Sequence, residues 1–274
     1  MRHFTATRFH EPTKRGLTKP FLVIAEDQAN GEELTLVVKS NAGYEAHGGV
    51  DYMHREAYCL LLSRAIGLEA VEPVAVEIPP GFEFGALDYR EHKGTDYFEL
   101  ITDSHGTNFA TIHLGNDWMP WTDTTRPRKV PQESIDHSFC FDAMVQNDDR
   151  KKDNPNLLWK GDRLVSLDFD RAWCLGYFQN DARPWRKALE RLKLRDSSLF
   201  PHIKLPKRAA ILGEEMLKSL SINKLRRLSK SCIDEVETSF PGANLDFQEL
   251  QPYVTKLSGE PEDFFQFLTA HCQP

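Results

Sequence analysis

A polar segment at residues 147–156, followed by an apolar run that ends at Asp168, constrains this chain more than any other feature. Within the segment, Asp149 and Asn154 stand in the pattern D-x-x-x-x-N. The apolar run 164–167 has strand character, and a short hairpin connects it to the polar segment. The sequence therefore predicts a loop and a hairpin whose two ends bring two carboxylates and one amide close together.

Two carboxylates and an amide oxygen in a small space suit phosphoryl transfer. One carboxylate orients the acceptor hydroxyl or receives its proton, and the other oxygens hold Mg²⁺ against the phosphates. We assign Asp149 as the catalytic base and Asn154 and Asp168 as metal ligands, with Asp170 supporting the metal shell. Lys151 is a second catalytic candidate, because a cation there could contact the transferring phosphoryl group. An ordinary surface lysine is the equal alternative.

Other assignments within this segment remain open. Asp148 is the rival of Asp149 for the role of base, and Asp153 reads as a solvated turn residue. An Asp-rich loop is also common as a simple turn or helix cap. The acid at the end of the following strand is what favours the chemical interpretation.

A candidate ion pair lies earlier in the chain. Lys39 ends the apolar run 34–39, and Glu56 lies in a helical pattern at 51–66. A strand lysine that contacts the α and β phosphates must be aimed, and a helix glutamate can aim it by ion pairing. The alternative is that Lys39 is an ordinary solvent-exposed lysine and Glu56 an ordinary solvent-exposed helix charge.

A turn before the first apolar strand is a candidate phosphate-binding element. It contains Gly16, Thr18 and Lys19, so that backbone N–H groups and a cation are available to an anion. The segment is no G-x-G-x-x-G motif, and an ordinary loop is the alternative.

Periodicity predicts a β-rich first half and a helical second half. Strands are expected at 21–25, 34–39, 71–78 and 108–114, with a polar turn at Asn30-Gly31 pairing the first two. Later, short strands are expected at 157–159 and 164–167, and helices at 134–146, 183–194, 207–219, 222–238 and, in pieces, 246–271. We therefore predict an α+β fold with a β-rich lobe at 1–115, a helical lobe at 116–274 and a cleft between them.

Composition limits the function classes. The formal charge of -7 argues against a general nucleic-acid coat, and we expect no direct nucleic-acid binding. Five scattered cysteines without C-x-x-C spacing favour reduced thiols. The N-terminal residues contain no apolar segment, so a cytoplasmic protein without membrane contact is expected. The sequence contains no G-x-S-x-G motif, so nothing in it supports a hydrolase.

Several segments in order resemble the HipA-like kinase family, in its compact single-module branch. The most specific of them runs from Asp149-Arg150 through Asn154-Pro155-Asn156-Leu157-Leu158. The others are Gly16 to Pro20, Val37-Val38-Lys39, Glu56 in its helix, Gly67-Leu68, Glu72 to Ile78, Ser104 to Thr111, and Leu167-Asp168-Phe169. The chain departs from the commoner pattern at Ala110 and at Phe169-Asp170.

The resemblance implies a two-lobed, protein-kinase-like fold that uses ATP and Mg²⁺. By matching positions, Lys39 would bind phosphates, Glu56 would pair with it and Asp149 would be the base, while Asn154 and Asp168 would hold the metal. Known relatives phosphorylate protein serine or threonine, and some act as growth-inhibiting toxins.

Our expectation is therefore an ATP- and Mg²⁺-dependent serine/threonine protein kinase of HipA-like type. One alternative is a small-molecule kinase of the aminoglycoside type, although those usually carry His-Gly where this chain has Asn147-Asp148. The other is a nucleotide-binding pseudokinase, which the occupied polar positions disfavour. The acceptor would be a hydroxyl of a protein or of a small molecule, and the sequence leaves open whether an antitoxin-like protein partner exists.

Overall fold

The computed structural model describes the whole chain except residues 15, 123–128, 174–182, 204–221, 242–246 and 273–274. Strands and helices mix in an α+β fold, and the chain divides into two compact units. Unit 1 comprises Met1–Ala57, Val71–Gly115 and Glu235–Leu245, and unit 2 comprises Tyr58–Ala70, Asn116–Asp234 and Asp246–Pro274. The predicted lobes are continuous in sequence, whereas each of these units draws on three segments.

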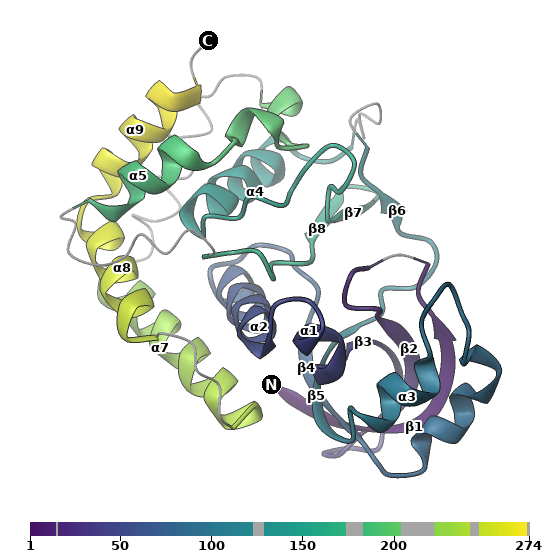
Figure 1. Ribbon diagram of the computed structural model, residues 1–274. Helices are drawn as coiled ribbons and strands as arrows, with labels where there is room; N and C mark the ends of the chain where they lie inside the picture. The colour runs from purple at the N-terminus through teal and green to yellow at the C-terminus, as the bar shows by residue number, and fades with distance from the viewer. Residues whose placement is uncertain (15, 123–128, 174–182, 204–221, 242–246, 273–274) are drawn as a thin grey trace. The chain divides into compact units, whose positions relative to one another are not determined.

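Unit 1 is built on a closed five-stranded barrel (Figure 1). Its strands follow the order β1-β2-β3-β5-β4, with bounds Arg2–Pro12, Phe21–Asp27, Glu33–Lys39, Gly106–Ile112 and Pro73–Ile78. The barrel closes through a parallel pairing of β1 with β4, and the other pairings are antiparallel. Alternate side chains of these strands point inward, because successive residues of a strand face opposite sides. They form a core that includes Phe4, Phe21, Val23, Leu36, Val38 and Val76.

The predicted hairpin of β2 and β3 is confirmed, with Ala25 opposite Leu34. The predicted strands at 71–78 and 108–114 are β4 and β5. Strand β1 was not predicted. Its register shifts between Ala6 and Arg8 and again between Phe9 and Glu11. Such bulges break the two-residue alternation by which a strand is recognised in sequence.

Short helices accompany the barrel strands in unit 1. Helix α1 (Asn41–Glu45) follows β3 directly, and Ser40 caps it by accepting a hydrogen bond from the Gly43 N–H. The 3-10 helix η1 (Phe82–Tyr89) and helix α3 (Tyr97–Thr102) pack together, and residues of both join the barrel core. Helix α2 (Val50–Ala65) confirms the helix predicted at 51–66; the division between the units falls inside it.

Unit 2 contains a small antiparallel sheet and most of the helices. The sheet has the order β6-β7-β8, with bounds Met119–Pro120, Leu157–Lys160 and Arg163–Ser166, so the predicted second hairpin is confirmed. The helices are α4 (Gln132–Met144), α5 (Pro184–Arg191), α7 (Ile222–Ser239), α8 (Phe247–Gly259) and α9 (Pro261–Cys272), with short 3-10 turns η2 (Leu194–Asp196) and η3 (Phe200–His202). The end of α7, from Glu235 onward, belongs to unit 1. The helix predicted at 207–219 lies outside the described residues.

Helix α4 positions the site because most of its surface is buried. Its last seven residues, Ser138 to Met144, are all buried. A helix that is covered on every side offers its neighbours a rigid support.

Among the described residues, we find no helix with the length and apolar character that crossing a bilayer requires.

Candidate active site

The loop between α4 and β7 is held in a compact shape by its own backbone. Helix α4 ends at Met144, and Gln146 adopts a left-handed conformation with φ 55°, which turns the chain out of the helix. Further on, the Lys151 N–H donates to the carbonyls of Asp149 at 2.9 Å and Asn154 at 3.0 Å. The Asn154 N–H returns a hydrogen bond of 3.2 Å to the Lys151 carbonyl. The D-x-x-x-x-N pattern is therefore a tight turn that keeps its two polar ends close.

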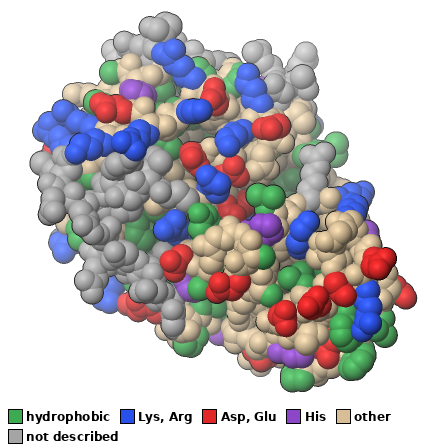
Figure 2. All heavy atoms as spheres, viewed as in Figure 1, with side chains coloured by type: hydrophobic (Ala, Val, Ile, Leu, Met, Phe, Trp, Pro, Cys, Tyr) green, Lys and Arg blue, Asp and Glu red, His purple; other side chains and the backbone are tan. Residues whose placement is uncertain are grey.

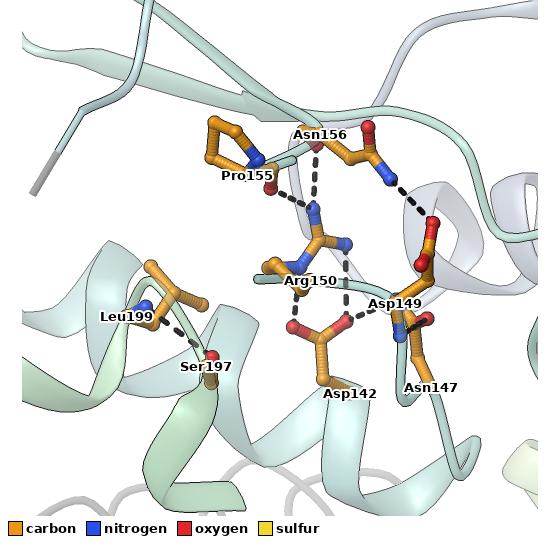
Figure 3. A network of polar contacts seen from close by, with 8 residues as sticks. All are labelled: Asp142, Asn147, Asp149, Arg150, Pro155, Asn156, Ser197 and Leu199. Carbon is orange, nitrogen blue, oxygen red and sulfur yellow. Dashed lines mark hydrogen bonds and ion pairs between the residues drawn. The ribbon is translucent and has the colours of Figure 1, made fainter. Parts of the chain in front are cut away.

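Arg150 ties this loop to helix α4 (Figure 3). Its guanidinium forms a two-pronged ion pair with Asp142, and both side chains are nearly inaccessible to solvent. The remaining Nη1 donates to the carbonyls of Pro155 and Asn156, and the Phe169 ring lies 5.1 Å from the guanidinium carbon. Every polar group of this buried pair thus has a partner, as a buried charge requires. One side chain fixes both ends of the loop to the helix.

Asp149 lies at the centre of a hydrogen-bond network. Asn154 Nδ2 donates to its Oδ2 at 2.8 Å, and Asn156 Nδ2 lies 3.5 Å from the same oxygen. The Asp149 N–H donates to Asn147 Oδ1 at 3.2 Å, which orients the residue from its backbone side. Figure 3 shows the Asp149 carboxylate pointing toward Asn156 and away from the Arg150 ion pair. The structure therefore brings the predicted base and the predicted amide ligand into direct contact.

The pKa of the Asp149 carboxyl is raised above its ordinary value. Burial contributes most, because it disfavours the charged form, and the negative charge of Asp168 adds to it. Lys151 and Arg171 act in the opposite direction, and the nearby Asp148 raises the pKa slightly. The two predicted acids thus interact electrostatically within unit 2. A carboxyl with a raised pKa in such a cluster is typical of a functional site.

Asp168 enters this cluster from the second hairpin. It follows β8 and has a left-handed backbone with φ 59°, which is uncommon for a residue with a Cβ. The hairpin is attached to the loop by the Leu167 N–H, which donates to the Asn156 carbonyl at 3.1 Å. Asp170 follows the buried Phe169 and is half-buried. The structure thus brings Asp149 and Asn154 into contact and attaches the hairpin that carries Asp168 to the same loop, while the catalytic and metal-binding roles of these residues stay predictions.

The donor set fits a hard divalent cation, which takes oxygen ligands. Asn154 uses Nδ2 as a donor, so its Oδ1 is the atom that could bind a metal. A bound divalent cation would offset the negative charges of Asp149 and Asp168. Within the described parts of the chain, no cluster of three or more His, Cys, Asp or Glu side chains could hold a metal. A metal here would thus depend on Asn154 and Asp168, and the role of Asp170 stays a prediction.

Lys151 lies next to the predicted base. Its Nζ is 3.6 Å from Asp149 Oδ1, and about half of its side chain is exposed. An exposed pair of this kind contributes little to stability. The ammonium group can therefore move toward a ligand without a large loss of folding free energy.

In unit 1, Lys39 and Glu56 form the ion pair that the sequence suggested. Lys39 Nζ lies 2.9 Å from Oε1 and 2.7 Å from Oε2 of Glu56. The Glu56 carboxylate is buried, and the Tyr44 hydroxyl donates to its Oε2 at 2.6 Å. The lysine side chain is 14% exposed and is therefore mostly shielded from solvent. Glu56 is thus fixed by Tyr44 and in turn orients Lys39 at the end of β3.

The turn with Gly16, Thr18 and Lys19 connects β1 and β2. Gly16 has φ 128°, and an added Cβ would lie 2.5 Å from the Pro20 ring, so this position requires glycine. The Lys19 N–H donates to the Gly16 carbonyl at 3.3 Å, and Lys19 itself is left-handed with φ 51°. A Cβ on Gly43 of α1 would lie 2.2 Å from the Thr18 carbonyl oxygen. The turn therefore rests on the helix that begins two residues after Lys39.

Three functional contacts were not predicted. Arg150 was noted only as part of the loop segment, without a role, and its buried partner Asp142 reveals its structural role. Asn156 was noted as part of the loop string, but its approach to Asp149 was not expected. Tyr44 was not considered, although a buried acid such as Glu56 needs a hydrogen-bond donor. The Asn-Pro-Asn order was the available signal for a tight return of the loop.

The comparison with known families identifies this chain as a kinase-type phosphotransferase. The chain belongs to the HipA-like kinase family, because the model of that family matches residues 7–176, more than half of the chain. Membership implies ATP as the phosphoryl donor and, as is usual for kinases, a divalent metal. A search of curated proteins finds no match for this chain.

Proposed function

We propose that this protein is an ATP- and Mg²⁺-dependent phosphotransferase that modifies serine or threonine hydroxyls of a protein. The observation that carries the proposal is the contact of Asp149 with Asn154 near the charge of Asp168, in a chain of the HipA-like kinase family. Carboxylate and amide oxygens in this arrangement match the needs of phosphoryl transfer, in which positioning and charge stabilisation do most of the work.

Each unit supplies one part of the proposed chemistry. In unit 2, Asp149 orients the acceptor hydroxyl and receives its proton, while Asn154 keeps the carboxylate in place through its Nδ2. Asn154 and Asp168 would hold Mg²⁺, which would neutralise charge on the phosphates. In unit 1, Lys39 binds the phosphates, and the Gly16–Lys19 turn offers backbone N–H groups to them.

Lys151 has a separate proposed role. Its ammonium group is close enough to Asp149 to oppose the rise of the Asp149 pKa, and it is exposed enough to follow a moving phosphoryl group. Replacing Lys151 by methionine should therefore lower kcat and leave the KM for ATP nearly unchanged, because the interaction is strongest in the transition state.

The decisive test compares two loss-of-function variants with a matched control. Asp149→Ala and Asp168→Asn should each lower phosphate transfer from labelled ATP by roughly 10³-fold, the order expected for a lost base or metal ligand. Asp153→Asn removes an exposed acid of the same loop and should retain activity. Mass spectrometry after incubation with ATP and Mg²⁺ reports the modified residue type. Full activity in both acid variants would refute this mechanism.

The same assay separates the acceptor classes. Labelled ATP is offered with proteins of a cell lysate in one arm and with a pool of small hydroxyl compounds, including aminoglycosides, in the other. Transfer to protein serine or threonine supports the proposal. Transfer restricted to small compounds would mean that the acceptor is a small molecule. Binding of ATP without transfer to any acceptor indicates a pseudokinase.

A further inference from the structure

Unit 2 contains a cavity of about 150 Å³ beside the catalytic loop. Helix α4 contributes Phe139 to its wall, the loop contributes Asp148 and Lys151, and the segment after α5 contributes Lys193 and Ser197. Lys151 is therefore shared: its Nζ lies 3.6 Å from the predicted base Asp149, and its side chain also lines the cavity. The cavity thus begins next to the residue that would receive the acceptor's proton.

The outer wall of the cavity is fastened to the catalytic loop. The Ser198 N–H donates to the Arg150 carbonyl at 3.0 Å, and Ser197 forms an antiparallel bridge with Lys151. Arg150 is itself anchored to Asp142, so the wall and the loop share one rigid support. A subsite built on such a support would hold a bound group in register with Asp149.

The charges around the cavity favour an anion. Lys151, Arg191 and Lys193 line it from two different segments. Of the lining acids, Asp142 is neutralised by Arg150, and Asp148 lies 3.7 Å from Arg171. Asp196 is exposed and opposes the three cations. Counted over the whole lining, four basic residues stand against three acids, Asp142, Asp148 and Asp196, so that the net charge of the cavity wall is positive.

The surrounding surface has the same sign. Residues 183–195 contain six Lys or Arg residues and one acid, Glu190, in a chain whose formal charge is -7. Arg183 and Arg186 pair with acids of α9, while Lys187 is exposed on α5. Figure 2 shows Lys and Arg side chains gathered over α5. Such a local field attracts an acidic partner despite the negative net charge.

We propose that this cavity is the acceptor subsite and that it binds an acidic side chain close to the phosphorylated hydroxyl. The inference rests on the proposed function and specifies the substrate as an acidic serine- or threonine-containing protein segment. The cavity is smaller than the several hundred Å³ of a typical small-molecule pocket, which fits a single carboxylate side chain.

The first experiment measures binding and does not depend on turnover. Three fluorescent peptides carry one serine flanked by glutamates, alanines or lysines, and anisotropy reports their affinity for the full chain. The glutamate peptide should bind at least about tenfold more tightly than the alanine peptide, and added salt should reduce this difference. Equal affinities, or tighter binding of the lysine peptide, would overturn the proposal.

Two charge reversals of the same type then locate the effect. Lys193→Glu changes a residue of the cavity wall, and Lys187→Glu makes the same charge change on α5, outside the lining. Lys193→Glu should weaken glutamate-peptide binding about tenfold and improve lysine-peptide binding, whereas Lys187→Glu should change either by less than about threefold. Equal effects of the two variants would show long-range attraction only and would refute the subsite. Thermal unfolding confirms that both variants are folded.

Phosphate transfer to the same peptides distinguishes this inference from the proposed function. Preferred transfer to the glutamate peptide supports both. Transfer without preference for charge contradicts the subsite and leaves the kinase proposal intact. Selective binding without transfer contradicts the proposed function and supports the anion site. Glycerate and glycerol 3-phosphate, added as competitors, should not displace the peptide at concentrations near its Kd; displacement would mean that a small anionic alcohol is the ligand.

Discussion

Unit 1 and unit 2 each hold a charged group at a predicted functional position, and the electrostatic surroundings of the two groups are opposite in character. Lys39 in unit 1 has both oxygens of Glu56 as partners, and Tyr44 completes the set. Asp149 in unit 2 is partly buried near a second acid, which raises its pKa. The first arrangement stabilises its charge through direct partners, whereas in the second burial and the repulsion from Asp168 together outweigh the attraction of Lys151 and Arg171. The ion pair in unit 1 thus fixes the orientation of its lysine, and the environment in unit 2 shifts the protonation of its acid.

The largest expected effect concerns the support of the acid cluster. Asp142→Ala leaves the Arg150 guanidinium buried without its counter-charge, which should lower the free energy of unfolding by about 3–5 kcal/mol. Asp117→Ala removes the exposed partner of Lys160 and should cost less than about 1 kcal/mol. Urea denaturation measures both. Similar small losses would mean that the loop does not depend on its buried anchor.

A second change tests whether orientation is the contribution of unit 1. Glu56→Gln removes the charge that aims Lys39, and kcat/KM for ATP should fall by about 10- to 100-fold, which corresponds to the loss of a hydrogen bond to a charged group. Tyr44→Phe keeps the ion pair and removes one donor, so its effect should be severalfold at most. Steady-state kinetics at several ATP concentrations provide the measurement. A larger loss in Tyr44→Phe than in Glu56→Gln would reverse the order that the contacts predict.

A third measurement addresses the charge repulsion in unit 2 directly. Without metal, the Asp149 carboxyl should titrate above the ordinary aspartate range, and Asp168→Asn should lower its pKa because one neighbouring negative charge is removed. Addition of Mg²⁺ to the unaltered protein should lower the pKa as well. Carbon-detected NMR of the carboxyl groups follows all three titrations. An Asp149 pKa that is unchanged in Asp168→Asn would contradict the proposed coupling.

The smallest predicted effect is a gain in thermal stability in a variant that loses activity. Because the pKa of Asp149 is raised in the folded state, the folded state binds this proton more tightly, and the contribution of Asp149 to stability falls as pH rises through that pKa. Asp149→Asn removes the unfavourable charge and should raise Tm at neutral pH by on the order of 1–3 °C, while abolishing phosphate transfer. The gain should disappear in acid, where the carboxyl is protonated in both states. A variant that is less stable at neutral pH would mean that Asp149 contributes to folding.

Local signals predicted much of this fold. Asn30-Gly31 and Gly161-Asp162 lie between apolar runs, and both mark the hairpins that the structure contains. The closure of the barrel was not predicted, because it pairs β1 with β4, two strands separated by about seventy residues that no short-range pattern connects. The bulges in β1 further concealed its period.

The candidate site followed the same division. The D-x-x-x-x-N pattern is local, and its contact between Asp149 and Asn154 could be inferred from spacing. The role of Arg150 could not, because an arginine beside two lysines normally belongs to a solvated run. Its burial results from the position of α4 behind the loop, which is a property of the tertiary structure.

The contact between Gly43 and Thr18 has a consequence for engineering the protein. The α1 backbone at Gly43 lies so close to the Thr18 carbonyl that a methyl group at residue 43 would clash with it and displace the β1–β2 turn. Gly43→Ala would lift that turn while leaving the side chains of Lys39 and Glu56 chemically unaltered. Replacing this glycine therefore offers a way to displace the β1–β2 turn without altering the Lys39–Glu56 ion pair.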